Sequence, residues 1–383
     1  MYARRGQINL HSNDKIFSSC ALFGMINLTG ERFASREPLR AISSMRERGN
    51  GLGGGFAIYG IYPDFRDLYA FHVMYMDWRS KSRAEKILMR DFRILFSEEI
   101  PTKNSNKLPG ALIFWRYFLE PEPSKIRDES VDTDEYVVRR VMKINAGVRG
   151  AYVISSGKNM GVFKGVGFPE DIEDFFHLDE YKGYMWICHA RFPTNTPGWW
   201  GGAHPFNILD WSVAHNGELS SYGVNRRYLE MQGYKCVMQT DTEVLAYAFD
   251  LLARRRKVQI ELIAKVLSPT YWEEIDSMEN GDRVMFRALR QAYGSLMMNG
   301  PFSIIVAHHG EMIGLADRKK LRPLVAGIKG NFLYISSEES AIRLISPNVD
   351  RIIRPSGGEM IIGRLRCLKV LEVPTLIGRC ILK

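Results

Sequence analysis

The chain has 383 residues, of which 45% are hydrophobic and 25% charged, as is ordinary for a soluble globular protein with ample chain for a full core. A net charge of +9 would allow attraction to nucleic acid, but the excess is spread along the sequence, so we expect no nucleic-acid partner. The densest basic run, residues 254–257, follows an apolar segment and predicts the solvated last turn of a helix.

The cysteines indicate a reducing environment. There are five, at positions 20, 188, 236, 367 and 380, with neither a disulfide framework nor the spacing of a zinc site, so we expect a cytoplasmic protein and no metal. No apolar run reaches the roughly 18 to 20 residues that span a bilayer. Polar residues interrupt the N-terminal segment where a signal peptide needs an apolar core, so residues 1–19 are expected to be a pro-segment or a simple N-terminal extension.

The first apolar segment begins at Cys20 and continues as Ala-Leu-Phe-Gly. Two interpretations fit it. Cys20 could be a structural residue at the start of a strand, which is the better interpretation of this segment taken alone. Alternatively, cleavage after Ser19 would give Cys20 a free α-amine with a pKa of about 7.7 to 8.0, able to act as the base for its own thiol.

The next elements offer no nucleotide site and no evident function. A short helix is expected at 41–45, and the glycine cluster at 51–55 lacks the Lys-Ser/Thr of a P-loop and the spacing of a dinucleotide fingerprint. We expect residues 62–181 to be an elaborated insertion within the same domain. Their patterns predict, in order, a helix at 80–96, a buried strand at 111–115, a charged connection at 121–136, a second helix at 136–146 and a hairpin at 151–164.

Residues 188–243 hold the parts of a site for a small zwitterion. Arg191, with Thr194, could bind a carboxylate, because a guanidinium presents paired donors to two oxygens. Asp241 could bind an ammonium group or merely cap the helix expected over 242–252. Asn216-Gly217 could form an oxyanion hole from one side-chain amide and one backbone N–H. The stretch lacks a nucleophile, because Cys188 lies in an apolar run and is expected to be a core residue.

The C-terminal third turns from helix to strands. A helical pattern covers 285–298, and the segments 302–307 and 312–316 predict a hairpin. Asp317-Arg318 begins a segment that ends Leu321-Arg322-Pro323-Leu324, and Tyr334 to Glu338 follows it. We place the end of the domain at 365 and treat 366–383 as a C-terminal tail, which leaves no room for a second, synthase module.

Several of these segments resemble, in this order, the signatures of the class II glutamine amidotransferases: Cys20 to Gly24, Arg191 to Thr194, Ala203 to Pro205, His215 to Glu218, Thr240 to Glu243 and Asp317 to Leu324. The resemblance implies an α+β fold, a four-layer αββα N-terminal-nucleophile hydrolase sandwich of two mostly antiparallel sheets, over residues 20–365. Ala21 departs from the family, in which Gly is usual after the nucleophile.

The resemblance also implies roles for these residues. Cys20 would be the nucleophile that forms a thioester with glutamine, and Asn216 and Gly217 would hold the oxyanion. Arg191 and Thr194 would bind the substrate carboxylate, and Asp241 its ammonium. His204 would lie close to the glutamine, where a structural role is at least as well supported as a catalytic one.

The amino-acid sequence of these segments most resembles the amidotransferase part of glutamate synthase. This implies a glutaminase subunit with no cofactor of its own, which passes ammonia to a separate FMN-bearing synthase subunit. A homo-oligomer is compatible with the sequence. The alternative is a catalytically inactive homologue that senses glutamine or acts as a scaffold.

Overall fold

Two antiparallel sheets form the centre of the molecule. The computed structural model describes residues 19–103, 112–193, 198–365 and 367–373, with side chains as far as 365. The first sheet has seven strands in the order β17-β15-β16-β1-β10-β3-β8. Its strands are β1 (Ala21–Asn27), β3 (Gly54–Tyr59), β8 (Met160–Gly165), β10 (Met185–Ala190), β15 (Val325–Lys329), β16 (Phe332–Ser336) and β17 (Arg351–Ile353).

The second sheet has six strands in the order β11-β12-β13-β14-β18-β19. They are β11 (Phe206–Ile208), β12 (Trp211–Gly217), β13 (Phe302–His308), β14 (Glu311–Ala316), β18 (Met360–Arg364) and β19 (Cys367–Val373). The predicted hairpin of β13 and β14 is present. Because β19 pairs with β18, the sheet continues beyond residue 365, where the sequence analysis ended the domain.

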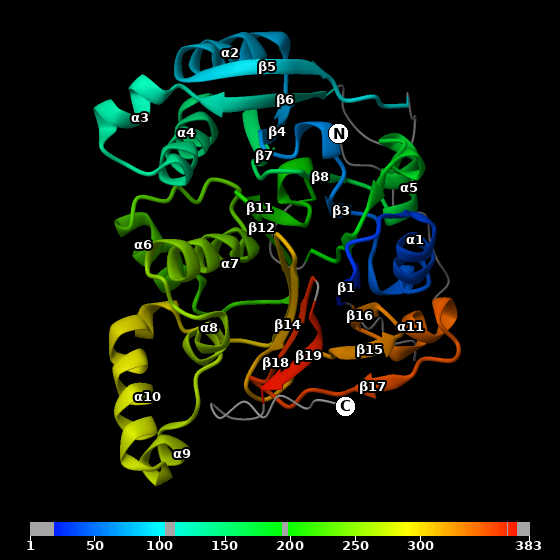
Figure 1. Cartoon of the computed structure of the whole chain (residues 1–383), viewed down its shortest axis with the longest axis vertical. Helices are drawn as coiled ribbons and strands as arrows, with labels where there is room; N and C mark the ends of the chain where they lie inside the picture. Colours follow the sequence, from blue (N-terminus) through cyan, green and yellow to red (C-terminus); the bar gives the residue numbers. More distant parts are fainter. Residues whose placement is uncertain (1–18, 104–111, 194–197, 366, 374–383) are drawn as a thin grey trace, which may run out of the picture.

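Alternation along the strands explains why the sheets stack. On β1, Leu22 and Ile26 join a core cluster with Ile305 of the second sheet, while Phe23 packs on the opposite face, against a layer of helices. Helices α1 (Arg36–Ser43), α5 (Pro169–Phe175) and α11 (Glu339–Ile345) cover the first sheet, and α6 (Tyr222–Met231) and α7 (Asp241–Phe249) cover the second (Figure 1). The predicted four-layer αββα sandwich is confirmed.

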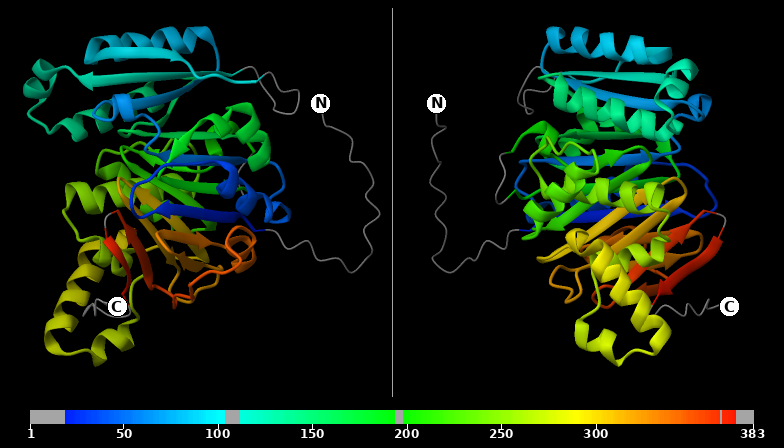
Figure 2. Two further views of the ribbon diagram at one scale, coloured as in Figure 1. Left: turned by 45° about the vertical axis from the view of Figure 1, so that its right-hand side comes forward. Right: turned by 90° about the vertical axis from the view of Figure 1, so that its left-hand side faces the viewer.

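The insertion is a separate four-stranded sheet at one end of this sandwich (Figure 2). It contains β4 (Tyr69–Tyr75), β5 (Phe92–Glu99), β6 (Ile113–Pro121) and β7 (Ala151–Ser155), with helices α2 (Trp78–Asp91), α3 (Pro123–Glu129) and α4 (Thr133–Gly147). The inserted segment is shorter than the predicted 62–181. Strand β8 and helix α5 lie within that range but belong to the sandwich, where β8 pairs with β3.

Three local predictions inside the insertion were wrong. The helix predicted at 80–96 ends at Asp91, because residues from Phe92 onward pair with β6. The connection at 121–136 contains α3, which has proline at its first turn, and the start of α4, where the Asp132 carboxylate accepts a hydrogen bond from the N–H of Glu135.

The third error is the hairpin at 151–164, because its two strands, β7 and β8, belong to different sheets. The backbone between them is held from the second sheet. Asn207 accepts from the N–H of Ser156 at 2.9 Å, and Asp210 accepts from the N–H of Lys158 at 2.7 Å. These side chains bind the backbone N–H groups at the turn, so β7 and β8 do not pair with each other. The chain instead passes from one sheet to the other.

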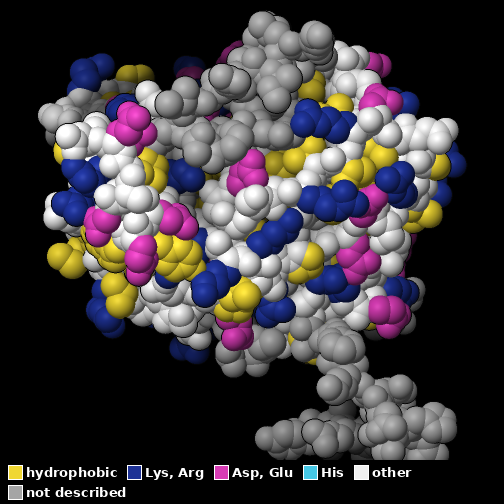
Figure 3. All heavy atoms as spheres, turned by 90° about the horizontal axis from the view of Figure 1, so that it is seen from below, with side chains coloured by type: hydrophobic (Ala, Val, Ile, Leu, Met, Phe, Trp, Pro, Cys, Tyr) yellow, Lys and Arg dark blue, Asp and Glu magenta, His cyan; other side chains and the backbone are white. Residues whose placement is uncertain are grey.

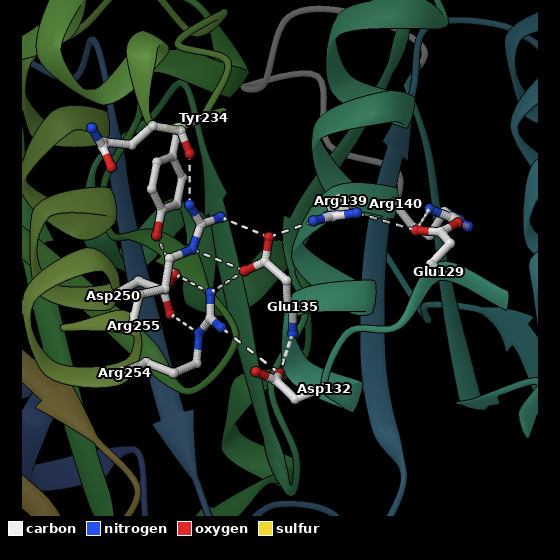
Figure 4. Close-up of polar contacts among 10 residues, drawn as sticks. Glu129, Asp132, Glu135, Arg139, Arg140, Tyr234, Asp250, Arg254 and Arg255 are labelled. Atoms are coloured by element: carbon white, nitrogen blue, oxygen red, sulfur yellow. Dashed lines mark hydrogen bonds and ion pairs between the residues drawn. The ribbon is translucent and has the colours of Figure 1, made fainter. Parts of the chain in front are cut away.

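The basic run 254–257 is also not the solvated helix end that we expected. Arg254 and Arg255 belong to the π-helical segment η5 (Asp250–Arg255) and contact the insertion (Figure 4). Both guanidinium groups donate to the Glu135 carboxylate of α4, each at 3.1 Å, and Arg254 also donates to Asp250 at 2.7 Å. The side chain of Arg254 is only 12% exposed. This ion-pair network therefore joins the insertion to the sandwich.

On the face in Figure 3, basic and acidic side chains are interspersed and form no continuous basic stripe. In the part of the chain that the structure describes, every helix is too short or too polar to cross a lipid bilayer.

A buried lysine lies between the two sheets. Lys164 of β8 is 2% exposed, and its Nζ donates to the Gly201 carbonyl at 3.1 Å and lies 3.9 Å from the centre of the Phe206 ring. Burial lowers the pKa of Lys164 to about 7, although the buried carboxylate of Glu243 opposes this shift. The cation is therefore costly to maintain in the folded state.

Removing the shared acceptor of the ion-pair network should weaken the fold. We expect Glu135→Ala to lower the free energy of unfolding by about 2 to 3 kcal/mol, because it removes an acceptor that two largely buried guanidinium groups share, although Arg254 keeps its pair with Asp250. Chemical denaturation measures this. The matched control is Glu230→Ala, which breaks an exposed pair with Arg226 and should cost less than about 0.5 kcal/mol. Equal losses in both variants would contradict the structural role of the network.

Lys164 should make stability depend on pH. Its pKa is about 7 in the fold against an ordinary 10.5, so between these values the unfolded chain binds more protons and stability rises with pH. From pH 7 to pH 9 the free energy of unfolding of the wild type should rise by about 2 kcal/mol relative to Lys164→Met. Urea denaturation at both pH values tests this, with Lys86→Met on an exposed position of α2 as the control that should follow the wild type.

Candidate active site

Strands from both sheets end beside one cavity. Its volume is about 330 Å³, and it lies where β1 begins, β10 and β12 end, and α7 begins. Five of the predicted site residues line it, although they are far apart in the sequence: Cys20, Arg191, His204, Gly217 and Asp241. Thr194 lies outside the described residues. The cavity therefore brings together a thiol, a guanidinium, a backbone glycine and a carboxylate.

Cys20 is held at its thiol and at its backbone carbonyl. The backbone N–H of Phe192 donates to Sγ at 3.3 Å, and the Cys20 carbonyl accepts from Arg48 Nε at 3.2 Å. Arg48 is itself paired with Glu338 at 2.8 Å. Burial raises the pKa of the Cys20 thiol, although the Phe192 N–H and the Arg191 charge oppose this. The thiol therefore stays protonated near neutral pH and needs a base in order to react.

Arg191 is 3% exposed and follows the last residue of β10. Two glycines leave space for its side chain. A Cβ on Gly53 would lie 2.9 Å from Arg191 Cδ, and a Cβ on Gly202 would lie 3.2 Å from Nη1. Burial lowers the pKa of Arg191, while the nearby Cys20 and Asp241 raise it. A buried guanidinium beside the thiol is suited to bind a carboxylate.

Asp241 is oriented by its neighbours rather than used as a helix cap. Thr240 is the N-cap of α7, and its hydroxyl accepts from the N–H of Thr242 at 3.3 Å. Asp241 accepts from the N–H of Leu219 at 2.9 Å and lies 3.5 Å from Nδ1 of His215. Burial would raise the pKa of Asp241, but His215 and these hydrogen bonds outweigh it and hold the pKa below its ordinary value. The carboxylate is therefore ionised and available to a cation.

Glycine is the only residue type that fits at position 217. Its φ is +142°, and a Cβ would lie 1.9 Å from the carbonyl oxygen of Pro301. Asn216 is fully buried, and neither its amide nitrogen nor its amide oxygen has a hydrogen-bond partner among the described residues. It adjoins the cavity between His215 and Gly217 without being part of the lining. An unsatisfied buried amide is costly, which is typical of a group that serves a ligand.

Three buried imidazoles support the floor of the site. The rings of His189 and His204 stack with centroids 4.1 Å apart. His204 Nε2 and His215 Nδ1 both lie within hydrogen-bond distance of the Thr242 hydroxyl, at 3.1 and 3.2 Å. Burial lowers the pKa of His189 to about 3 and that of His204 well below its ordinary value. His204 is therefore neutral and positions the start of α7, which gives it a structural contact as well as a place in the lining.

No site role was predicted for Arg48, His215, Thr242 or the backbone of Phe192. Phe192, His215 and Thr242 lie within segments that resemble the family, whereas Arg48 lies between the expected helix at 41–45 and the glycine cluster at 51–55. Position within a motif was therefore the available signal, but the contact that each residue makes depends on strands that are distant in the sequence. Among the described residues, no group of three or more His, Cys, Asp or Glu side chains could hold a metal ion.

Comparison with known proteins places this chain in a family. A model of the class II glutamine amidotransferases matches residues 84–376, a range that includes Arg191, Gly217 and Asp241 but begins after Cys20. An uncharacterized protein of Archaeoglobus fulgidus is 54% identical over 92% of this chain and 94% of its own length.

Two relatives with named activities match less of their own length. The amidophosphoribosyltransferase of Methanocaldococcus jannaschii is 27% identical over 56% of this chain and 40% of its own length. The glutamate synthase [NADPH] large chain of Azospirillum brasilense is 27% identical over 62% of this chain and 17% of its own length. The chain thus spans less than half of either relative. Since the family model covers most of the chain and every lining residue of the cavity except Cys20, this protein belongs to the class II glutamine amidotransferases.

Proposed function

We propose that this protein hydrolyses the side-chain amide of L-glutamine to glutamate and ammonia. The observation that supports the proposal best is the shared cavity, in which the Cys20 thiol meets a cationic side chain, Arg191, and an anionic one, Asp241. These two charges match the carboxylate and the ammonium of an amino acid. Such a clamp leaves the side chain of the ligand as the part that can reach the thiol.

The proposed chemistry begins with the base. Cleavage after Ser19 would free the α-amine of Cys20, whose pKa of about 7.7 to 8.0 lets it accept the thiol proton near neutrality. The sulfur then adds to the amide carbon, and the backbone N–H of Gly217 and the amide of Asn216 donate to the resulting oxyanion. Collapse transfers the proton to the leaving nitrogen and releases ammonia. Water hydrolyses the thioester, which yields glutamate and restores the thiol.

Contacts around Cys20 favour a fixed position for the new N-terminus. Arg48 donates to the Cys20 carbonyl from Nε and to the Ser19 hydroxyl from Nη2, at 3.2 and 2.5 Å. The first of these contacts does not depend on Ser19. It would therefore survive cleavage and keep the freed amine beside its own thiol.

We further propose that the ammonia passes to a separate FMN-bearing synthase subunit of glutamate-synthase type in the cytoplasm. The likeness to the glutamate synthase large chain supports this acceptor, since it covers more of this chain than the likeness to the amidophosphoribosyltransferase. Isolation from the native host tests it. An associated subunit that carries FMN is the expected result, and an associated phosphoribosyltransferase would replace this acceptor with another.

Mass spectrometry should find an active form that begins at Cys20. With protein from the native host, a glutamine-like electrophile such as 6-diazo-5-oxo-L-norleucine should label this species once, at Cys20, and abolish glutamate release. Cys20→Ser should lose labelling and activity. Cys236→Ser is the matched control, since this buried cysteine does not line the cavity. An active species that retains Met1 would disprove the processing step.

Asn216→Ala should lower kcat about 100- to 1,000-fold with little change in KM, because an oxyanion donor acts mainly in the transition state. Asp241→Asn should instead raise KM for glutamine, because it removes the negative charge that faces the substrate ammonium. Steady-state glutamate release measures both, and Asn348→Ala at an exposed position is the control. Glutamine binding by the wild-type protein without turnover would favour the alternative of a sensor or scaffold.

A further inference from the structure

A second cavity lies beneath a helical arm on the outside of the sandwich. The arm consists of α8 (Ile260–Leu267), α9 (Trp272–Ser277) and α10 (Asn280–Tyr293), at the lower left of Figure 1. The cavity has a volume of about 330 Å³ and lies between the arm, the segment after β14 and the segment before β18. It shares no lining residue with the cavity at Cys20.

Two cations and two hydroxyls face this space. Lys265 and Arg318 line it, and Lys265 forms no ion pair with any residue that the structure describes. The guanidinium of Arg318 lies 4.7 Å from the centre of the Tyr271 ring and donates to Asn299 at 3.3 Å, which holds it in place. The Arg318 guanidinium is therefore fixed in position beside the cavity.

Two hydroxyls in this cavity, those of Ser268 and Tyr271, point independently to a ligand. Ser268 is 3% exposed, and neither its Oγ nor the hydroxyl of Tyr271 has a hydrogen-bond partner among the described residues. Buried hydroxyls without partners are rare because each one costs free energy. The close approach of Gly358 keeps the space near Ser268 open, since a Cβ on this glycine would lie 3.3 Å from the Ser268 Oγ.

We infer that this cavity binds a small metabolite through an oxyanion group, a phosphate or a carboxylate, held by Lys265, Arg318 and the hydroxyls of Ser268 and Tyr271. Two acidic residues, Glu274 and Asp282, also line the cavity. They disfavour a polyanion such as nucleic acid and suit the hydroxyl or amino groups of a small ligand. The ligand class is therefore a sugar phosphate or an amino acid.

The position of Arg318 connects this cavity with the first one. The preceding residue, Asp317, accepts from the backbone N–H groups of Phe302, Lys319 and Leu321 at 3.2, 2.9 and 2.9 Å. This carboxylate organises a turn that continues to Arg322. Burial raises the pKa of the Cys20 thiol, and the Arg322 charge is among the weaker influences that oppose this rise. A ligand on Arg318 would therefore restrain the turn that carries Arg322, and it would regulate glutamine hydrolysis, a consequence that rests on the proposed function.

Binding is tested first, by isothermal titration calorimetry of the purified wild-type protein. The probes are inorganic phosphate, glucose 6-phosphate and L-glutamate, each at constant ionic strength. We expect saturable binding of at least one probe at a site that iodoacetamide alkylation of Cys20 does not block. Phosphate and sugar phosphate binding without glutamate binding would assign a phosphate site, and the reverse would assign a carboxylate site.

Variants then locate the site. Lys265→Met and Ser268→Ala should each weaken binding, the first by about tenfold or more, because a hydrogen bond to a charged group is lost. Lys86→Met is the control and should bind like the wild type. Thermal melts check that each variant is folded. If Lys265→Met does not fold, Arg318→Gln serves as the second test. Saturable binding of none of the probes, or binding that these variants leave unchanged, would overturn the inference.

The regulatory consequence is tested separately, by measuring glutamine hydrolysis in the presence of the bound probe. The bound probe should change kcat or KM for glutamine in the wild type and in Lys86→Met, but not in Lys265→Met. If the protein hydrolyses no glutamine, the proposed function fails while the calorimetric result for this cavity still stands. If hydrolysis occurs but does not respond to a probe that binds, the regulatory consequence is disproved.

Discussion

The pairing of β1 between β10 and β16 is the constraint on which the site depends. All seven residues of β1 are buried, and its register places Ala21 opposite Ala190. Cys20 precedes Ala21 and Phe192 lies two residues after Ala190, so they meet where these strands end, and the Phe192 N–H reaches the sulfur at 3.3 Å. A slip of one residue would turn every side chain of β1 to the opposite face and move the thiol away from the cavity.

The second constraint is electrostatic. The cavity holds a guanidinium and a carboxylate close to a neutral thiol, in surroundings where isolated charges are costly. The neighbouring imidazoles of His189 and His204 stay uncharged, so they add no cation beside Arg191. Asp241 is stabilised in its ionised form by hydrogen bonds. Arg191 and Asp241 thus give the site charges of opposite sign, which is the pattern that a zwitterionic ligand requires.

Much of this site could be predicted because its chemistry is carried by short segments. Arg191, Gly217 and Asp241 were grouped from the needs of an amino-acid ligand, and the structure places all three on one cavity. The contact of Arg48 with the Cys20 carbonyl could not be predicted in this way. It depends on how an irregular segment lies against β1, and no local pattern encodes that arrangement.

The errors in the fold have a related cause. The strands at 151–155 and 160–165 have the pattern of a hairpin, but Asn207 and Asp210 bind the backbone at the turn from about fifty residues away. The predicted helix at 80–96 ended early because Phe92 and the residues after it found a partner in β6. In both regions the local preference was overridden by tertiary contacts, which a single sequence does not display.

The two additions to the sandwich differ in how directly they can influence the site. Asp210 and Asn207 hold the backbone between β7 and β8. Asp210 directly precedes β12 and Asn207 of β11 pairs with Ser212 near its start, whereas Gly217 lies at its other end. Seven residues of strand separate these ends by about 20 Å. The helical arm instead contacts Arg318, in the same turn as Arg322. Burial raises the pKa of the Cys20 thiol, and the Arg322 charge opposes this less than the Phe192 N–H and Arg191 do. A structural change in the insertion would therefore have to be transmitted along the whole of β12 to reach Gly217. A change in the arm would have to shift only the turn that carries Arg318 and Arg322.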